Sequence, residues 1–185
     1  MKKIFCLLIC FTSLFFIVSC SKTPNNTNNT NNTAETPYML EYDMFINKIK
    51  QAVGPDEMFT SIKKISTNKS YDNNYTDLFT LTSMLYEKEY MMSVIYEGNS
   101  LKSVDIIGER NMISDGQYSF SVDYITLSSV IYQILNQQSD AYGIMVSDFN
   151  MTCQDAKIMK TKTLDNWIMI YSANNEEMSF HFQLK

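Results

Sequence analysis

The sequence predicts an α+β domain in which an antiparallel β-sheet is covered by helices on one face, and three observations support this class. Two stretches have the 3.6-residue apolar spacing of a helix. Each is followed by short stretches rich in β-branched and aromatic residues, separated by turn residues. The connections between the expected strands are short, which favours antiparallel neighbours. The expected order, a helix followed by about four strands, occurs twice and is compatible with an internal duplication.

The first expected helix has one apolar stripe, contains Asp43 in its first turn and ends before Gly54. The stripe consists of Tyr42, Phe45, Ile46, Ile49 and Val53. Pro55 predicts the start of another helix, because proline is common in the first turn of helices. That helix would carry the stripe Met58, Ile62 and Ile65. We expect residues 66–77, which are mostly polar, to form a loop.

The apolar pattern then changes to one typical of β-strands. Strands are predicted at residues 78–86, 90–97 and 101–108, which are rich in β-branched and aromatic side chains. Gly98 and Asn99 predict a tight hairpin turn between the last two of these strands.

The second half begins with a turn at Asp115 and Gly116. Residues 117–122 alternate between polar and apolar side chains and predict a half-buried strand. Asp123 is expected to cap a helix that ends near Gln138. The apolar stripe of this helix is Leu127, Val130, Ile131 and Ile134. Further strands are predicted at residues 142–149, 153–162, 167–171 and 178–184.

The composition is that of a globular protein. The 185 residues are enough for one domain with appendages, and 45% of them are hydrophobic and 19% charged. The chain has 15 Lys and Arg against 20 Asp and Glu, which gives a formal net charge of −5. We therefore expect no nucleic-acid partner, because a nucleic-acid binder needs a basic face.

The N-terminus has the organisation of a secretory signal peptide. Lys2 and Lys3 are followed by an almost continuous apolar run from Ile4 to Val18, which is shorter than the ~20 residues that a membrane-spanning helix needs. The last residues of the run resemble the lipobox of bacterial lipoprotein signal peptides, which is an aliphatic residue, a small or aliphatic residue, a small residue and an obligatory cysteine. These four residues are Ile17, Val18, Ser19 and Cys20. The alternative is an ordinary signal peptide or a single membrane helix.

The resemblance implies signal-peptidase cleavage between Ser19 and Cys20 and a lipid on the Cys20 sulfur, usually with an acyl chain on the new amino group. Each buried methylene contributes ~0.8 kcal/mol, so two or three chains hold a protein stably on a bilayer. Ser21 stands where lipoproteins of the inner membrane usually have aspartate, which favours the outer membrane in a cell with two membranes. The membrane is thus the first expected partner, through Cys20.

Three segments are expected. Residues 1–19 are the signal peptide, residues 20–37 are the lipidated cysteine with a disordered Asn/Thr-rich tether, and residues 38–185 form a single α+β domain. As a flexible coil the tether spans roughly 20–25 Å. Loss of the signal peptide removes Lys2 and Lys3, so the formal net charge changes from −5 to −7.

Cys153 is the one cysteine that would remain in the domain, so no internal disulfide is expected there. We interpret it as a small buried hydrophobic residue. His181 is the only histidine of the chain and occupies a polar position in the last expected strand. A Ser-His-Asp or Cys-His mechanism, or a histidine-based metal site, would have to use His181. We interpret it as a solvated strand residue without a catalytic role.

Two motifs resemble functional sites but lack required residues. Residues 61–64 and 66–69 have the S-x-x-K spacing of penicillin-binding enzymes, but neither S-D-N nor K-T-G follows. Residues 72–77 begin like an EF-hand loop, but Asp77 replaces the required glycine and Ser83 the required glutamate. A weak cation site is the only metal-binding alternative that this loop leaves.

No cofactor is expected, because the five glycines are scattered and form no phosphate-binding loop. The acids that could form a catalytic pair lie at expected strand ends or turns. They are Glu87, Glu89, Asp105, Glu109, Glu176 and Glu177. Arg110 is the only arginine and a candidate anchor.

The sequence therefore predicts a membrane-anchored envelope lipoprotein whose domain has no catalysis of its own and binds a protein or another envelope component. The contact would involve the exposed sheet face or the tyrosine-bearing loops. One alternative is a carrier or sensor of a small apolar ligand, which needs a closed cavity of at least a few hundred Å³ between sheet and helices. Another is a small hydrolase with two converging carboxyl groups of raised pKa.

Overall fold

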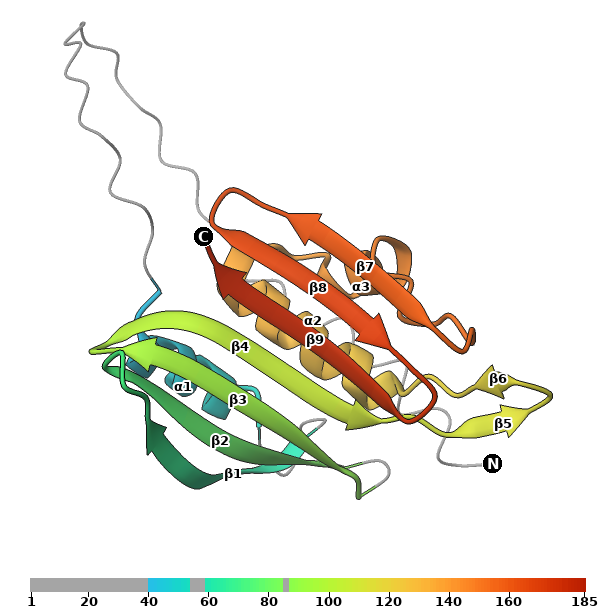
Figure 1. The fold of residues 1–185 in the computed structure, drawn as a ribbon, viewed down its shortest axis with the longest axis horizontal. Helices are drawn as coiled ribbons and strands as arrows, with labels where there is room; N and C mark the ends of the chain where they lie inside the picture. The colour runs from blue at the N-terminus through green and yellow to red at the C-terminus, as the bar shows by residue number, and fades with distance from the viewer. Residues whose placement is uncertain (1–39, 54–58, 85–86) are drawn as a thin grey trace, which may run out of the picture. The chain divides into compact units, whose positions relative to one another are not determined.

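The computed structural model describes residues 40–53, 59–84 and 87–185 (Figure 1). The predicted cleavage and lipidation site at Ser19 and Cys20 and the predicted tether lie outside these residues. Within them the predicted α+β class is confirmed, because three helices accompany an antiparallel sheet of seven strands. No helix in this described part is both long and apolar enough to cross a membrane.

The elements follow the chain as α1 (Tyr42–Gln51), β1 (Phe59–Lys69), β2 (Asn74–Ser83), β3 (Glu89–Glu97), β4 (Ser100–Glu109), β5 (Met112–Ser114), β6 (Gln117–Tyr118), α2 (Val122–Asn136), α3 (Ala141–Ser147), β7 (Ile158–Thr163), β8 (Trp167–Ala173) and β9 (Glu177–Leu184). The large sheet has the order β1-β2-β3-β4-β9-β8-β7, and β5 pairs with β6 in a separate hairpin.

The helix-then-strands order occurs twice, as the sequence predicts. One half is α1 followed by β1 to β4, and the other is α2 and α3 followed by β7 to β9. The halves join through β4 and β9, which pair antiparallel from Ser103 opposite Gln183 to Glu109 opposite Glu177. The C-terminal strand is therefore a central strand of the sheet (Figure 1).

The core lies between one face of the sheet and the helices. Inward side chains of the strands form a single apolar cluster with buried side chains of the helices, among them Phe45, Ile49, Val94, Ile131 and Phe182. Tyr124 of α2 donates a hydrogen bond from its hydroxyl to the Ile106 carbonyl, at 2.8 Å. The Tyr124 ring lies so close to β4 that a Cβ at Gly108 would stand 2.8 Å from its Cδ2, which explains the glycine.

The helix predicted to start at Pro55 is wrong from residue 59 on, because residues 59–69 form strand β1. Its first residues, up to 58, lie outside the described part. The stripe misleads because a bulge between Lys64 and Ser66 places Ile65 outside the regular pairing, where it is 53% exposed. The loop predicted over 66–77 is confirmed only at residues 70–73, because the residues before them belong to β1 and those after them to β2.

The strand predicted over residues 142–149 is wrong as well, because α3 occupies this segment. Asp140 starts the helix by accepting a hydrogen bond from the Gly143 amide at 3.3 Å. The strand predicted over residues 153–162 is confirmed only in β7.

The start of α2 also differs from the prediction. The strand expected over residues 117–122 is limited to β6. Ser121, not Asp123, caps α2, because its hydroxyl accepts a hydrogen bond from the Tyr124 amide at 3.2 Å. Asp123 lies in the first helical turn, fully buried, and accepts a hydrogen bond from Ser83.

Candidate functional site

The face of the large sheet opposite the helices, here called the open face, has few charges in its middle. Outward positions of the central strands alternate between small polar and aliphatic side chains. The aliphatic members are Leu78, Met91, Ile95, Ile107, Ile168 and Ile170. The ionisable groups in the middle of this face are Asp105 and His181, whereas the glutamates of these strands stand at strand ends.

Asp105 of β4 and His181 of β9 are directly opposite each other and form a hydrogen bond, which is an ion pair when His181 is protonated. His181 Nδ1 lies 2.5 Å from Asp105 Oδ1, and about a third of each side chain is exposed (32% and 30%). The hydrogen bond to Asp105 raises the pKa of His181 above its ordinary value, against the opposing effect of burial. His181 is therefore only partly solvated, and it has a carboxylate partner that the sequence does not indicate.

The arrangement around this pair differs from a catalytic triad. Ser93 of β3 donates a hydrogen bond to Asp105 Oδ2 at 3.2 Å, so the carboxylate stands between the hydroxyl and the imidazole. In a Ser-His-Asp triad the imidazole stands between the other two and removes the proton from the hydroxyl. The Ser93 hydroxyl thus contacts the carboxylate and not the imidazole. The three groups form a polar row between Leu78 and Ile170.

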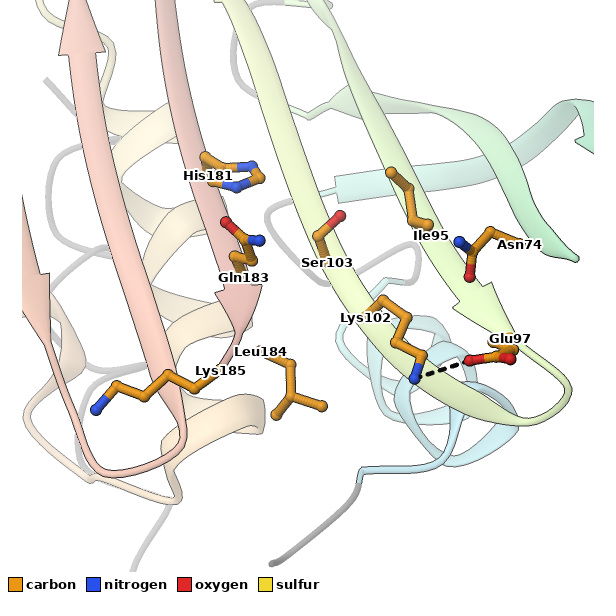
Figure 2. Close-up of a pocket in the computed structure, with 9 residues that line it drawn as sticks. All are labelled: Asn74, Ile95, Glu97, Lys102, Ser103, His181, Gln183, Leu184 and Lys185. Atoms are coloured by element: carbon orange, nitrogen blue, oxygen red, sulfur yellow. Dashed lines mark ion pairs between the residues drawn. The ribbon is translucent and has the colours of Figure 1, made fainter. Parts of the chain in front are cut away.

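A shallow pocket of about 520 Å³ lies on the open face beside this pair (Figure 2). Its polar side chains include His181, Gln183 and Ser103, and Ile95 contributes an aliphatic surface. At its rim Lys102 Nζ forms an ion pair with a Glu97 oxygen at 3.0 Å. The pocket therefore extends the mixed polar and aliphatic character of the open face toward the β3–β4 turn.

The carboxylate of Asp77, the last residue of the motif that resembles a calcium loop, is already hydrogen-bonded to other side chains of the protein. Its carboxylate is fully buried and accepts hydrogen bonds from the Tyr42 hydroxyl, from Thr67 Oγ1 at 2.6 Å and from Lys64 Nζ at 3.1 Å. These bonds connect α1, β1 and β2. Asp77 therefore has a structural role, and Lys64 of the first S-x-x-K motif is its counter-ion.

Arg110, a candidate anchor by sequence, is buried and contacts other segments of its own chain. Its side chain is 4% exposed and donates hydrogen bonds to the carbonyls of Asn174, at 3.2 Å, and Cys153, at 3.0 Å. Its guanidinium also lies 5.0 Å from the centre of the Tyr118 ring. Cys153 is half-buried, not fully buried as predicted, and its sulfur accepts a hydrogen bond from the Asp155 amide at 3.4 Å.

The two alternative functions receive no support from the geometry. Core side chains such as Tyr124, Ile131 and Phe180, each 0% exposed, fill the space between sheet and helices where an apolar ligand would lie. Among the described carboxyl groups with a shifted pKa, that of Asp148 is lowered by its hydrogen bond with Lys162. That of Asp77 is lowered because its hydrogen bonds outweigh the raising effect of burial. A hydrolase of this kind needs a raised pKa.

Within residues 40–53, 59–84 and 87–185 there is no group of three or more His, Cys, Asp or Glu side chains that could hold a metal ion. Comparison with protein families, with curated proteins and with solved structures finds no match for this chain.

Proposed function

We propose that this protein is a bacterial envelope lipoprotein, anchored by a lipid on Cys20, whose domain binds a protein partner through the open face and catalyses no reaction. The observation that carries the proposal is the composition of the middle of that face. Six aliphatic side chains stand among small polar ones, and the single acid there, Asp105, is hydrogen-bonded to His181. Protein interfaces typically have few charged residues in their centre and a polar rim around it.

The polar row through Ser93, Asp105 and His181 supports binding rather than catalysis. Its groups are fixed by hydrogen bonds, so a partner could contact them without ordering them first. The row is flanked by aliphatic residues, which would supply the apolar area of an interface.

The proposal is tested by photo-cross-linking in cells that make the full chain. A photoreactive amino acid is placed at Ile170, in the middle of the open face, and for comparison at Tyr71, in the β1–β2 turn. We expect one discrete adduct from position 170 and none from position 71. The same adduct from both positions, or none from position 170 in a folded and membrane-bound protein, would contradict the proposal.

The anchor requires a separate test. Replacement of Cys20 by Ala should abolish incorporation of labelled fatty acid and leave the precursor uncleaved, because the lipidated cysteine is the residue at which the lipoprotein peptidase acts. Replacement of Ser21 by Ala is the matched control and should leave both unchanged. A C20A protein that still matures and stays on the membrane would refute the lipid anchor.

A further inference from the structure

One end of the open face is acidic. Glu109, the last residue of β4, is directly opposite Glu177, the first of β9. Glu89 of β3 stands two residues before Met91, which is opposite Ile107, so the register places Glu89 in the same cross-strand row. All three side chains are exposed.

No ion pair in the described part of the chain involves any of these three glutamates. Like charges that stand opposite each other on neighbouring strands repel and destabilise a sheet. A cation supplied from outside would relieve this repulsion. The row therefore favours a positively charged group over a neutral or anionic one.

Apolar side chains lie beside the acidic row. Met91 and Ile107 form the neighbouring row on the open face, which is about 7 Å away for a two-residue step along a strand. The β5–β6 hairpin follows β4, and its residues Met112 and Ile113 are 65% and 58% exposed. An occupant of this end would thus meet glutamates and aliphatic side chains together.

The acidic end lies at the end of β4 opposite to its first residues, which pair with the first described residue of the chain. The described chain begins at Leu40, whose carbonyl accepts a hydrogen bond from the Leu101 amide at the start of β4, whereas Glu109 is at the end of that strand. Ten residues of β4 span about 33 Å.

We propose that the partner of the open face presents a basic, aliphatic protein segment to this end. Lys or Arg side chains of the segment would contact Glu89, Glu109 and Glu177, and its aliphatic side chains would pack on Met91 and Ile107. The proposal rests on the proposed binding function and adds the chemistry of the partner.

Other occupants agree less well with the observations. Anionic headgroups and nucleic acids would be repelled by the three carboxylates. A second copy of this chain could bring Lys102 from the other end of its own open face, but that lysine is already paired with Glu97.

The test uses the mature lipoprotein in detergent micelles and two labelled peptides, whose binding is followed by fluorescence anisotropy. Both peptides have the same alternating Ile and Thr residues, and one carries three lysines where the other carries three glutamates. We expect saturable binding of the lysine peptide only, with an affinity that falls at least about fivefold when the ionic strength rises from 0.05 to 0.3 M. Equal binding of both peptides, or binding of neither, would overturn the inference.

Charge-reversal variants locate the site. The double variant E109K/E177K should weaken binding of the lysine peptide about tenfold or more, because it removes two of the three carboxylates. The matched control D72K/D165K changes the net charge equally at exposed positions elsewhere and should bind within about twofold of the wild type. Equal loss in both variants would show an effect of net charge and overturn the inference.

The two proposals fail in different ways. If the photo-adduct at position 170 forms normally in E109K/E177K, the open face still binds a partner but its acidic end does not select it. If no adduct forms from position 170 in the wild type, the binding function itself fails. An adduct at position 170 that is lost in E109K/E177K and kept in D72K/D165K supports both.

Discussion

Asp105 and His181 are 76 residues apart in the chain, yet Asp105 Oδ1 lies 2.5 Å from His181 Nδ1 at the centre of the sheet. The contact exists because β4 and β9, the last strands of the two halves, are neighbours. A carboxylate only accepts hydrogen bonds, so Nδ1 carries the proton and Nε2 is the nitrogen left to interact with other groups.

Replacement of Asp105 by Asn should lower the pKa of His181, because the hydrogen bond to the carboxylate is the largest cause of its raised value. Partial burial, which lowers the pKa, would then be opposed only by the weaker effect of the hydrogen bond with Gln183. An NMR titration of the imidazole protons measures the change without ambiguity, since the chain has one histidine. The control S93A keeps the ion pair and should shift the pKa less; an equal shift in both variants would refute this cause.

The same pair should make stability depend on pH. The pKa of His181 is higher in the folded protein than in the unfolded chain, where it is about 6.5. Its contribution to stability is therefore fully present below about pH 6.5 and lost as the pH rises through the folded value. Urea unfolding at pH 5.5 and pH 9 should show a larger difference between wild type and D105N at pH 5.5. A larger difference at pH 9 would contradict the sign.

Replacement of Asp77 by Ala should destabilise the fold by about 2–4 kcal/mol, because it leaves the Tyr42 and Thr67 hydroxyl groups without their acceptor. The pKa of Asp77 is lowered in the folded protein, so its contribution is present above about pH 4 and lost as the pH falls through the folded value. Urea unfolding at pH 7 and pH 3 measures both effects. Thr76→Ala, on the open face, is the control and should cost far less.

Replacement of Arg110 by Met should cost about 2–3 kcal/mol, because the carbonyls of Asn174 and Cys153 lose their donors. Replacement by Lys should recover only part of this, since an ammonium lacks the planar fork that reaches both carbonyls. Hydrogen exchange of the Tyr118 amide, which donates to the Gln154 carbonyl at 2.9 Å, reports on the attachment of the β5–β6 hairpin. Unchanged exchange in R110M would contradict the role of Arg110 as its anchor.

Replacement of Gly108 by Ala should cost about 1–3 kcal/mol, because the new methyl group would stand 2.8 Å from the Tyr124 ring in a packed core. Thermal unfolding measures the loss, and Thr161→Ala on the exposed edge strand β7 is the control. A neutral G108A would show that the Tyr124 ring can move away at no cost.

Much of the fold could be predicted from local patterns. The strands near residues 90–97, 101–108 and 178–184 are regular enough that their period alone identifies them, and the turn at Gly98-Asn99 follows from its residues. The predictions are wrong where the local sequence pattern disagrees with the secondary structure that the whole fold imposes. Residues 59–69 form an edge strand with a bulge, which disturbs the period of two, and residues 141–147 form a short helix whose apolar composition also suits a strand.

The candidate site could be predicted only in part. The alternation in β9 places His181 on a polar face, but nothing local identifies Asp105 as its partner or Ser93 as the next member of the row. The acidic pair Glu109 and Glu177 is hidden for the same reason, because each residue is a plausible solvent-exposed strand end when its own strand is considered alone.

The sequence by itself determined the elements with strong periodicity, the α+β class and the expectation of a lipid anchor at Cys20, because hydrophobic period and the lipobox are properties of neighbouring residues. Only the tertiary structure decided that the C-terminal strand lies in the centre of the sheet, and hence that Asp105 meets His181 and Glu109 meets Glu177. The physical reason is that strands pair so that side chains from distant segments are buried in one common core. The residues of a single strand do not specify its neighbours.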